Sequence, residues 1–157
     1  MKNIQIITTI SLLFIATCIS AQSISKNALG LRIGDNDGFG GEISYQRHIG
    51  NNNRLEFDLG FRDSNNVEAF KLVGLHQWVY KLDNNFNWFV GVGAGVGAYE
   101  TPNNDGAFAL AAADLGIEYN FNIPLLLSLD IRPEIGFNDN YSDDLDLDIA
   151  LGIRYQF

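Results

Sequence analysis

The chain has 157 residues, enough for one domain, and carries 19 Asp and Glu against 10 Lys and Arg, for a formal net charge of −9. This acidic balance argues against a nucleic-acid partner, which would require a basic stripe on the surface. No stretch after residue 22 contains about 18 consecutive apolar residues, so membrane-spanning helices are excluded from that part of the chain.

The N-terminal segment has the pattern of a cleavable secretory signal peptide. A positive start at Lys2 is followed by an apolar run over residues 4–19 and a small-residue exit that ends at Ala21. We therefore predict a signal peptide over residues 1–21 and a mature domain over residues 22–157. A single membrane anchor is the alternative, but polar residues interrupt the run and it is short for a span of about 20 residues.

Cys18 is the only cysteine and leaves a lipoprotein signal as a further alternative. Cleavage after Ala21 instead removes the thiol from the mature chain. Disulfide bonds within the mature chain and cysteine catalysis are then both excluded.

The rest of the chain divides into eight runs with strand character. They cover residues 27–34, 40–49, 54–62, 67–82, 86–99, 107–121, 125–137 and 144–157. The links between them are rich in Asn, Asp, Gly and Pro, which suit tight turns. Because every link is short enough for a hairpin, neighbouring strands should pair antiparallel in an up-and-down meander.

The last run alternates most strictly. From Leu145 to Phe157 every odd position holds a large apolar residue and every even position a polar or small one. Successive strand side chains point to opposite faces, so the run forms one apolar stripe and one polar stripe. A membrane protein without helical spans must be a closed barrel, because only closure gives every backbone polar group a partner.

Two runs depart from this alternation. In residues 67–82 the alternation of apolar and polar residues is interrupted at Val73 and Leu75, which predicts a β-bulge there. In residues 107–121 it is interrupted at Phe108 and Leu110, which suggests a register shift.

Residue size indicates which face lies inside. The interior of an eight-stranded barrel is only wide enough for side chains to fill it. We therefore expect the bulky apolar face outside and the glycines and charged residues in the lumen, where the charges should pair. The predicted lumen charges are Arg32, Glu42, Glu56, Asp58, Arg62, Lys71, Asp114, Glu118, Asp130, Arg132, Glu134, Asp146, Asp148 and Arg154. The alternative is a soluble, lipocalin-like barrel whose apolar face lines a cavity for a small apolar ligand.

Aromatic residues gather near the strand ends that share one side of the meander. They are Tyr45, Tyr80, Phe86, Trp88, Tyr119, Phe121, Tyr155 and Phe157. Such rings favour the headgroup level of a membrane, so the pattern predicts an aromatic girdle.

The signal peptide, the eight hairpin-linked runs and the terminal Tyr155-Gln156-Phe157 resemble the small OmpA/OmpX-type outer-membrane β-barrel family. The resemblance implies an all-β, eight-stranded transmembrane barrel in the outer membrane of a diderm bacterium. It also implies that both termini are periplasmic and that the strand ending at Phe157 is read by the barrel-assembly machinery. The expected surroundings are outer-membrane lipid and lipopolysaccharide.

With this topology, the links that face outward are acidic. Asp35, Asp37, Asp139, Asp143 and Asp144 are candidate ligands of Ca²⁺ or Mg²⁺, which prefer several oxygen ligands and would either bridge to lipopolysaccharide phosphates or capture a ligand. A solubilising acidic surface is the simpler interpretation. The run Asp35-Asn-Asp-Gly38 lacks the spaced ligands and closing Glu of an EF-hand loop.

No catalytic constellation is evident. The only histidines, His48 and His76, are not placed beside Ser64 or Ser142 in the expected topology. A filled lumen also disfavours a pore. We therefore expect a monomeric, non-enzymatic envelope protein without a cofactor, in a structural or surface-interaction role.

Overall fold

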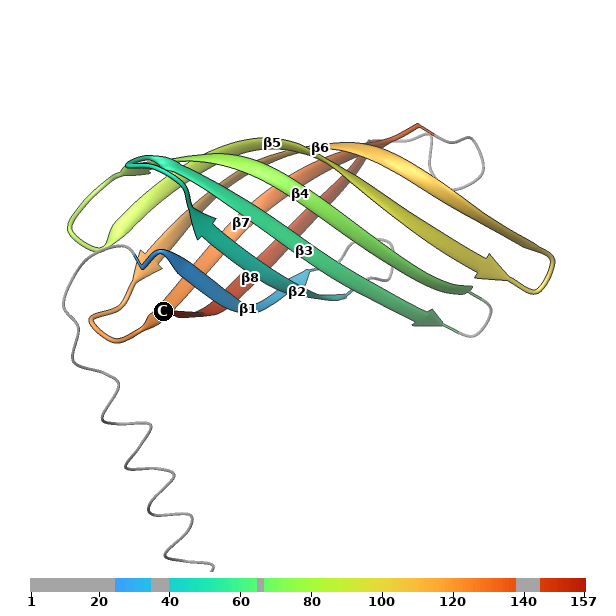
Figure 1. The fold of residues 1–157 in the computed structure, drawn as a ribbon, viewed down its shortest axis with the longest axis horizontal. Helices are drawn as coiled ribbons and strands as arrows, with labels where there is room; N and C mark the ends of the chain where they lie inside the picture. Colours follow the sequence, from blue (N-terminus) through green and yellow to red (C-terminus); the bar gives the residue numbers. More distant parts are fainter. Residues whose placement is uncertain (1–24, 35–39, 65–66, 138–144) are drawn as a thin grey trace, which may run out of the picture.

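The computed structural model describes residues 25–34, 40–64, 67–137 and 145–157. Eight strands form one closed barrel in which each strand pairs with its neighbours in the chain and β1 pairs with β8 (Figure 1). The strands are β1 Asn27–Gly34, β2 Gly41–His48, β3 Asn53–Ser64, β4 Val67–Lys81, β5 Phe86–Thr101, β6 Asn104–Asn120, β7 Leu125–Gly136 and β8 Leu145–Gln156. All pairs are antiparallel, which confirms the predicted meander and its strand count.

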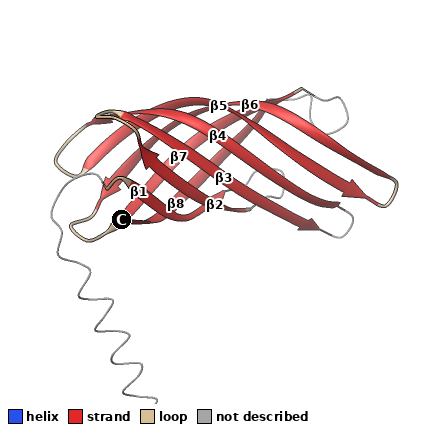
Figure 2. Ribbon diagram, in the orientation of Figure 1, coloured by secondary structure: helices blue, strands red, loops and turns tan. Residues whose placement is uncertain are grey.

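The described residues contain strands, turns and short loops only (Figure 2). Among them there is no helix that is long and apolar enough to cross a membrane. The predicted signal peptide, residues 1–21, lies outside the described residues.

The strands differ strongly in length. β1 and β2 have 8 residues each, whereas β4, β5 and β6 have 15, 16 and 17. At the end of the barrel opposite the C-terminus, the strands β3, β4, β5 and β6 consequently extend beyond the described ends of β1 and β2 (Figure 1). One side of the wall is therefore taller than the other.

The predicted loop over residues 100–106 is wrong, because β5 continues to Thr101 and β6 begins at Asn104. The Thr101 hydroxyl closes this tight turn, since it donates to the Asn104 carbonyl at 2.6 Å and accepts from the Asn104 amide at 3.0 Å. Turn-forming residues here sit at the ends of a paired hairpin.

The predicted bulge in β4 is also wrong. The strand pairs with β3 and β5 in continuous registers, and every second residue from Ala69 to Val79 is buried. Val73 and Leu75 face the lumen, and the lumen is locally apolar around them.

The same apolar region explains the irregularity in β6, where no register shift occurs against β5. Phe108 and Leu110 point inward and pack with lumen residues of β4 and β5. The cluster consists of Ala69, Val73, Leu75, Tyr99, Phe108, Leu110 and Ala112. We call it the apolar cluster.

Candidate functional site

The outer wall of the barrel is apolar. On β8, Leu147 and Ile149 are each 54% exposed and Leu151 is 42% exposed, whereas Asp148 between them is 1% exposed. The partner strand β1 repeats this arrangement with exposed Leu29, Leu31 and Ile33, and the other six strands also carry exposed large apolar side chains. The predicted orientation, with bulky residues outside and charges inside, is confirmed.

This orientation contradicts the lipocalin-like alternative. A soluble barrel that binds an apolar ligand would turn its bulky side chains inward. Here the wall exposes them around the whole barrel, far beyond the single patches found on soluble proteins. Such a wall is compatible with lipid and incompatible with water.

Aromatic rings meet one another at the end of the wall that carries the C-terminus. Tyr80 stacks on Trp88 with ring centroids 4.7 Å apart, and Tyr155 stacks on Phe157 at 6.4 Å. Tyr119 contacts both Phe86 and Phe121 edge to face, each at 4.7 Å. Seven of the eight predicted girdle residues therefore form ring contacts with one another, whereas the Tyr45 hydroxyl donates to the Asn27 side-chain oxygen at 2.9 Å. Trp78 lies on the same wall and contacts His76 edge to face at 4.8 Å.

Inside the barrel, Arg132 is the centre of an ionic network. Its guanidinium lies 2.6 Å from Glu42, 2.8 Å from Asp58 and 2.8 Å from Glu134, and it is fully buried. Asp148 lies slightly farther away, at 3.5 Å. One base thus connects carboxylates from β2, β3, β7 and β8.

Glu42 is shared with two other bases. Arg32 contacts it at 3.0 Å and also pairs with Asp130 and Asp148. Lys71 lies 3.6 Å from it, in addition to a closer contact with Glu134 at 3.0 Å. The network therefore reaches every side of the lumen except the apolar cluster.

A second polar group fills the lumen nearer the C-terminal end. Arg154 donates to Glu56 at 2.9 Å and to the hydroxyls of Ser44 and Ser128 at 2.9 and 2.8 Å. Gln46 donates to the same Glu56 at 2.5 Å. The neutral Gln46 amide thus donates to the buried carboxylate, and the neutral serine hydroxyls accept from the buried guanidinium.

Arg54 is a lumen residue that the sequence-based analysis missed. Its fully buried guanidinium contacts Glu118 at 2.6 Å, donates to Gln77 at 2.7 Å and lies 4.9 Å from the centre of the Phe89 ring. The signal was available, because Arg54 has the same parity as Glu56 and Asp58. It was overlooked because the predicted strand began at that residue.

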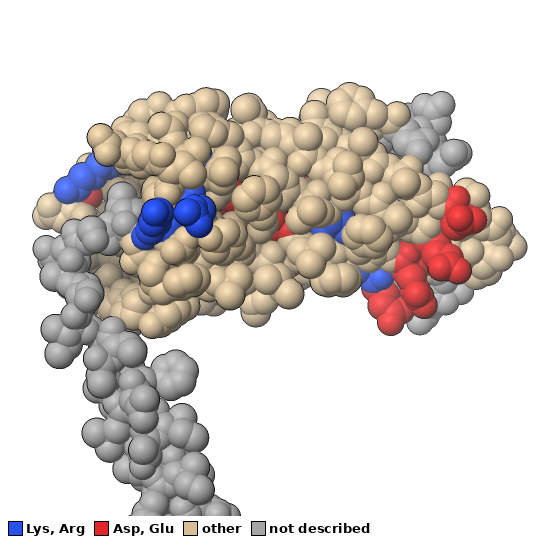
Figure 3. All heavy atoms as spheres, viewed as in Figure 1, with Lys and Arg blue, Asp and Glu red and all other residues tan. Residues whose placement is uncertain are grey.

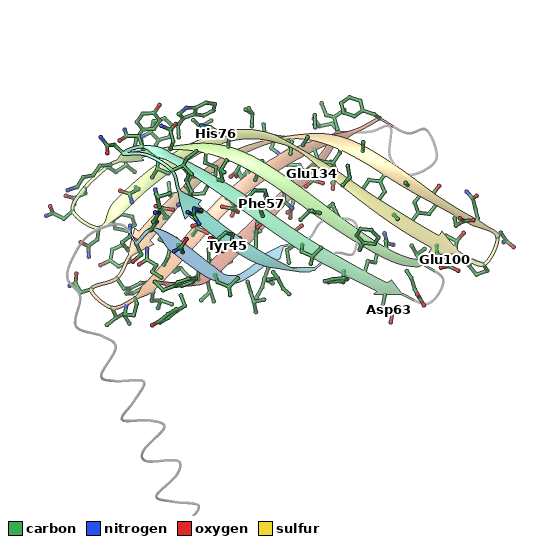
Figure 4. The ribbon with its side chains drawn as sticks, viewed as in Figure 1. Tyr45, Phe57, Asp63, His76, Glu100 and Glu134 are labelled. Atoms are coloured by element: carbon green, nitrogen blue, oxygen red, sulfur yellow. The ribbon has the colours of Figure 1, made fainter. Side chains whose placement is uncertain are left out.

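Acidic side chains form a row at the end of the barrel opposite the C-terminus. Asp63 pairs across the strands with Glu68, Glu68 with Glu100, and Glu100 with Asp105. All four are exposed. Figure 4 shows Asp63 and Glu100 at this end, far from Tyr45 and His76. We call these four residues the acidic row.

The predicted Ca²⁺ or Mg²⁺ ligands Asp35, Asp37, Asp139, Asp143 and Asp144 lie outside the described residues. Within the described part of the chain there is no group of three or more His, Cys, Asp or Glu side chains that could hold a metal ion. Cation binding by the five aspartates stays a prediction, and titration calorimetry of the folded protein with calcium would test it.

The structure places the two histidines toward the end that carries the aromatic rings. His76 lies on the outer wall, where its Nε2 is 3.2 Å from the Asn53 side-chain oxygen. It pairs across the strands with Leu55, whereas Ser64 pairs with Val67 at the far end of the same hairpin. His48 ends β2 and its backbone amide donates to the Lys26 carbonyl at 2.9 Å.

No family model and no curated protein matches this sequence. Solved structures do match. The N-terminal β-barrel domain of Pseudomonas aeruginosa OprF has a TM-score of 0.66 at 12% identity, covering 85% of this chain and 99% of that one. Neisserial surface protein A, NspA, has a TM-score of 0.61 at 12% identity, covering 83% and 94%.

This chain has the fold of the small eight-stranded outer-membrane β-barrels. Yersinia pestis Ail, the attachment invasion locus protein, extends the comparison with a TM-score of 0.56 at 16% identity, covering 85% of this chain and 97% of that one. The predicted resemblance to OmpA/OmpX-type barrels is confirmed as a likeness of fold. At these identities, the likeness does not extend to the activity of any one neighbour.

Proposed function

We propose that this chain is a monomeric, non-enzymatic integral barrel of the outer membrane of a diderm bacterium, exported by its N-terminal signal peptide. Its role is to contribute to envelope structure or to interaction at the cell surface. The observation that supports the proposal is that the barrel exposes apolar side chains on its outer wall and buries charged side chains in its lumen. Only a lipid surrounding makes that arrangement favourable.

The lumen supports a structural role. Arg32 of β1 is tied to Asp130 of β7, and Arg132 of β7 is tied to Asp58 of β3, so the ion pairs span the barrel. Buried pairs of this kind hold their partners in fixed positions. A lumen filled in this way is suited to a rigid plug and unsuited to a continuous water channel.

The positions of the two described chain ends support an orientation of the barrel in the membrane. Both described chain ends lie at the end of the barrel with the aromatic rings, which we assign to the periplasm (Figure 1). The four hairpins at the opposite end then face the exterior and lipopolysaccharide. The strand ending at the exposed Phe157 is the one that we expect the barrel-assembly machinery to engage.

A charge placed on the wall tests the proposal. At the bilayer midplane of a barrel, an arginine on the lipid face costs about 2–4 kcal/mol. We expect Leu151→Arg, in the middle of β8, to lower the free energy of unfolding in lipid vesicles by about that amount. Leu82→Arg is the matched control, because Leu82 is also exposed but follows the end of β4, where the cost is about 0–1 kcal/mol.

Extraction and gel mobility provide the second measurement. A membrane barrel remains with the membrane fraction until detergent is added, and its folded form migrates differently from the boiled form. Folding in buffer without lipid or detergent, together with a neutral effect of Leu151→Arg, would contradict the proposal.

A further inference from the structure

Exposed charges are segregated between the two ends of the barrel. Among the described residues, the exposed Lys and Arg side chains are Lys26, Arg47 and Lys81, all at the end with the C-terminus. The acidic row lies at the other end, and Asp83 is the one exposed acidic side chain that accompanies the three bases. Figure 3 shows a large group of Asp and Glu at the right and Lys and Arg at the left, with further Lys and Arg near the middle and beside the acidic group. Half-buried Arg62 directly precedes Asp63 at the acidic end.

The three bases lie at the border of the aromatic girdle. Arg47 is on the same face of β2 as Tyr45 but closer to the strand end, and Lys81 follows Tyr80, which stacks on Trp88. Lys26 precedes β1, where its carbonyl accepts the His48 amide. Aromatic rings occupy the headgroup level of a membrane, so these cations lie at the depth of lipid phosphates.

Within the described residues, none of the three bases forms an ion pair. This contrasts with the buried bases of the lumen, which all have carboxylate partners. Arg47 has the parity of the outer wall, whereas Lys81 has the parity of the lumen residues Gln77 and Val79 and is exposed at the mouth of the barrel. From this rim, long Lys and Arg side chains can reach the membrane interface. The three side chains are therefore available to an anionic group at that level.

We propose that Lys26, Arg47 and Lys81 form a basic collar that binds the headgroups of anionic phospholipids in the leaflet at the C-terminal end of the barrel. The inference rests on the proposed membrane location. Charge complementarity favours this partner, and the continuous apolar wall beside the collar accommodates its acyl chains. The acidic row repels the same lipids from the opposite leaflet, so the charge pattern gives the two ends different lipid surroundings.

The two tryptophans of the chain provide an internal probe, because Trp88 stacks on Tyr80 in the girdle and Trp78 lies two residues before Tyr80 on the same face of β4. The barrel is folded into phosphatidylcholine vesicles that contain either brominated phosphatidylglycerol or brominated phosphatidylcholine at the same mole fraction. Bromine quenches a nearby tryptophan, so the ratio of the two quenching efficiencies reports the local enrichment of the anionic lipid. Each base near a membrane surface contributes about 1 kcal/mol, which corresponds to an enrichment of up to about fivefold.

We expect a wild-type enrichment of about two- to fivefold at low salt. Increasing ionic strength should reduce it, because exposed charges are screened. The Lys26→Gln, Arg47→Gln, Lys81→Gln variant should show a ratio close to one. The matched control neutralises three residues at the other end, as Asp63→Asn, Glu68→Gln, Glu100→Gln, and should keep the wild-type ratio.

The outcomes separate the two proposals. Equal quenching of the wild type by both brominated lipids would overturn the basic collar, while membrane insertion would stand. Enrichment that persists in the collar variant would also overturn it. Absence of quenching by either lipid, without a heat-modifiable band, would instead contradict the membrane location itself.

Discussion

Two regions fill the same narrow lumen by different means. The ionic network around Arg132 and Glu42 draws on β1, β2, β3, β4, β7 and β8. The apolar cluster draws only on β4, β5 and β6. One region is held by charge pairing between residues distant in sequence, and the other by packing between consecutive strands.

The difference shows what each region contributes. In the ionic network, contacts such as the one between Arg32 and Asp130 join opposite ends of the sequence and form only when the barrel closes. In the apolar cluster, shape is decisive. The Phe108 ring occupies the space directly opposite Gly97, where a side chain on the glycine would meet it. Substitutions in the ionic network are therefore limited by the need to balance buried charge, and substitutions in the apolar cluster are limited by the available volume.

Removing the central base should have the largest effect. Arg132→Ala leaves Glu42, Asp58, Glu134 and Asp148 without their shared cation, and breaking a buried pair costs about 3–5 kcal/mol. We expect a loss of that size in the free energy of unfolding, measured by denaturant titration in detergent micelles with tryptophan fluorescence.

If Arg132→Ala does not fold, Arg132→Lys provides the measurement, because it keeps the charge and loses only the bidentate geometry. It should be less stable than the wild type and still fold. Arg47→Ala is the control, since it removes an exposed arginine and should change stability little. Wild-type stability of Arg132→Ala would show that the network does not hold the barrel together.

Adding volume tests the apolar cluster. Gly97→Ala places a methyl group against both the Phe108 ring and the Phe70 backbone carbonyl, and overpacking of this kind costs about 1–3 kcal/mol. The same change at Gly41, where a methyl group would meet nothing within 4 Å, is the matched control.

A smaller residue at position 108 should relieve the contact with the ring, while the contact with the Phe70 carbonyl remains. The double variant Gly97→Ala, Phe108→Leu is expected to be more stable than the sum of the two single losses predicts, because contacting residues couple. Additive losses in the same denaturant titration would contradict direct packing between the two residues.

The buried Phe89 ring makes both an apolar contact and a contact with a charged group in the lumen. It packs at Gly116 and lies 4.9 Å from the Arg54 guanidinium. Phe89→Leu keeps most of the apolar volume but removes the aromatic face. We expect a loss of about 1 kcal/mol, within the range of a buried cation–π contact. Phe57→Leu on the exposed wall is the control, and an equal loss there would show that the cation–π contact contributes nothing.

The alternation of residues was enough to predict the strands and their outward faces, because period two is a local property of the chain. It was not enough for the apolar cluster, because Val73, Leu75, Phe108 and Leu110 place bulky residues inward. The sequence contains a signal for two of them. Phe108 lies directly opposite Gly97 and Leu110 opposite Gly95, so glycines on the partner strand create the space.

The partners of the lumen charges could not be predicted. The sequence identified most of the buried ions, but their pairing depends on how the barrel closes. Arg132 contacts Asp58 and Glu42, which lie 74 and 90 residues away in sequence. No local pattern encodes such distances.

The acidic row should show the smallest effect and the opposite sign. Glu100 faces Glu68 on one side and Asp105 on the other, and like charges directly opposite one another destabilise a sheet. Glu100→Gln should therefore raise the free energy of unfolding by about 0.3 kcal/mol at low salt. At 1 M salt the Debye length falls to about 3 Å, so the gain should vanish, whereas the loss in Arg132→Lys should persist because buried pairs are screened much less. Lys81→Gln, an exposed charge without a like-charged neighbour across the strand, is the control. If Glu100→Gln still raises the free energy of unfolding at high salt, repulsion between exposed carboxylates is not the cause. The interactions of the acidic row would then be screened as little as those of the buried ion pairs in the lumen.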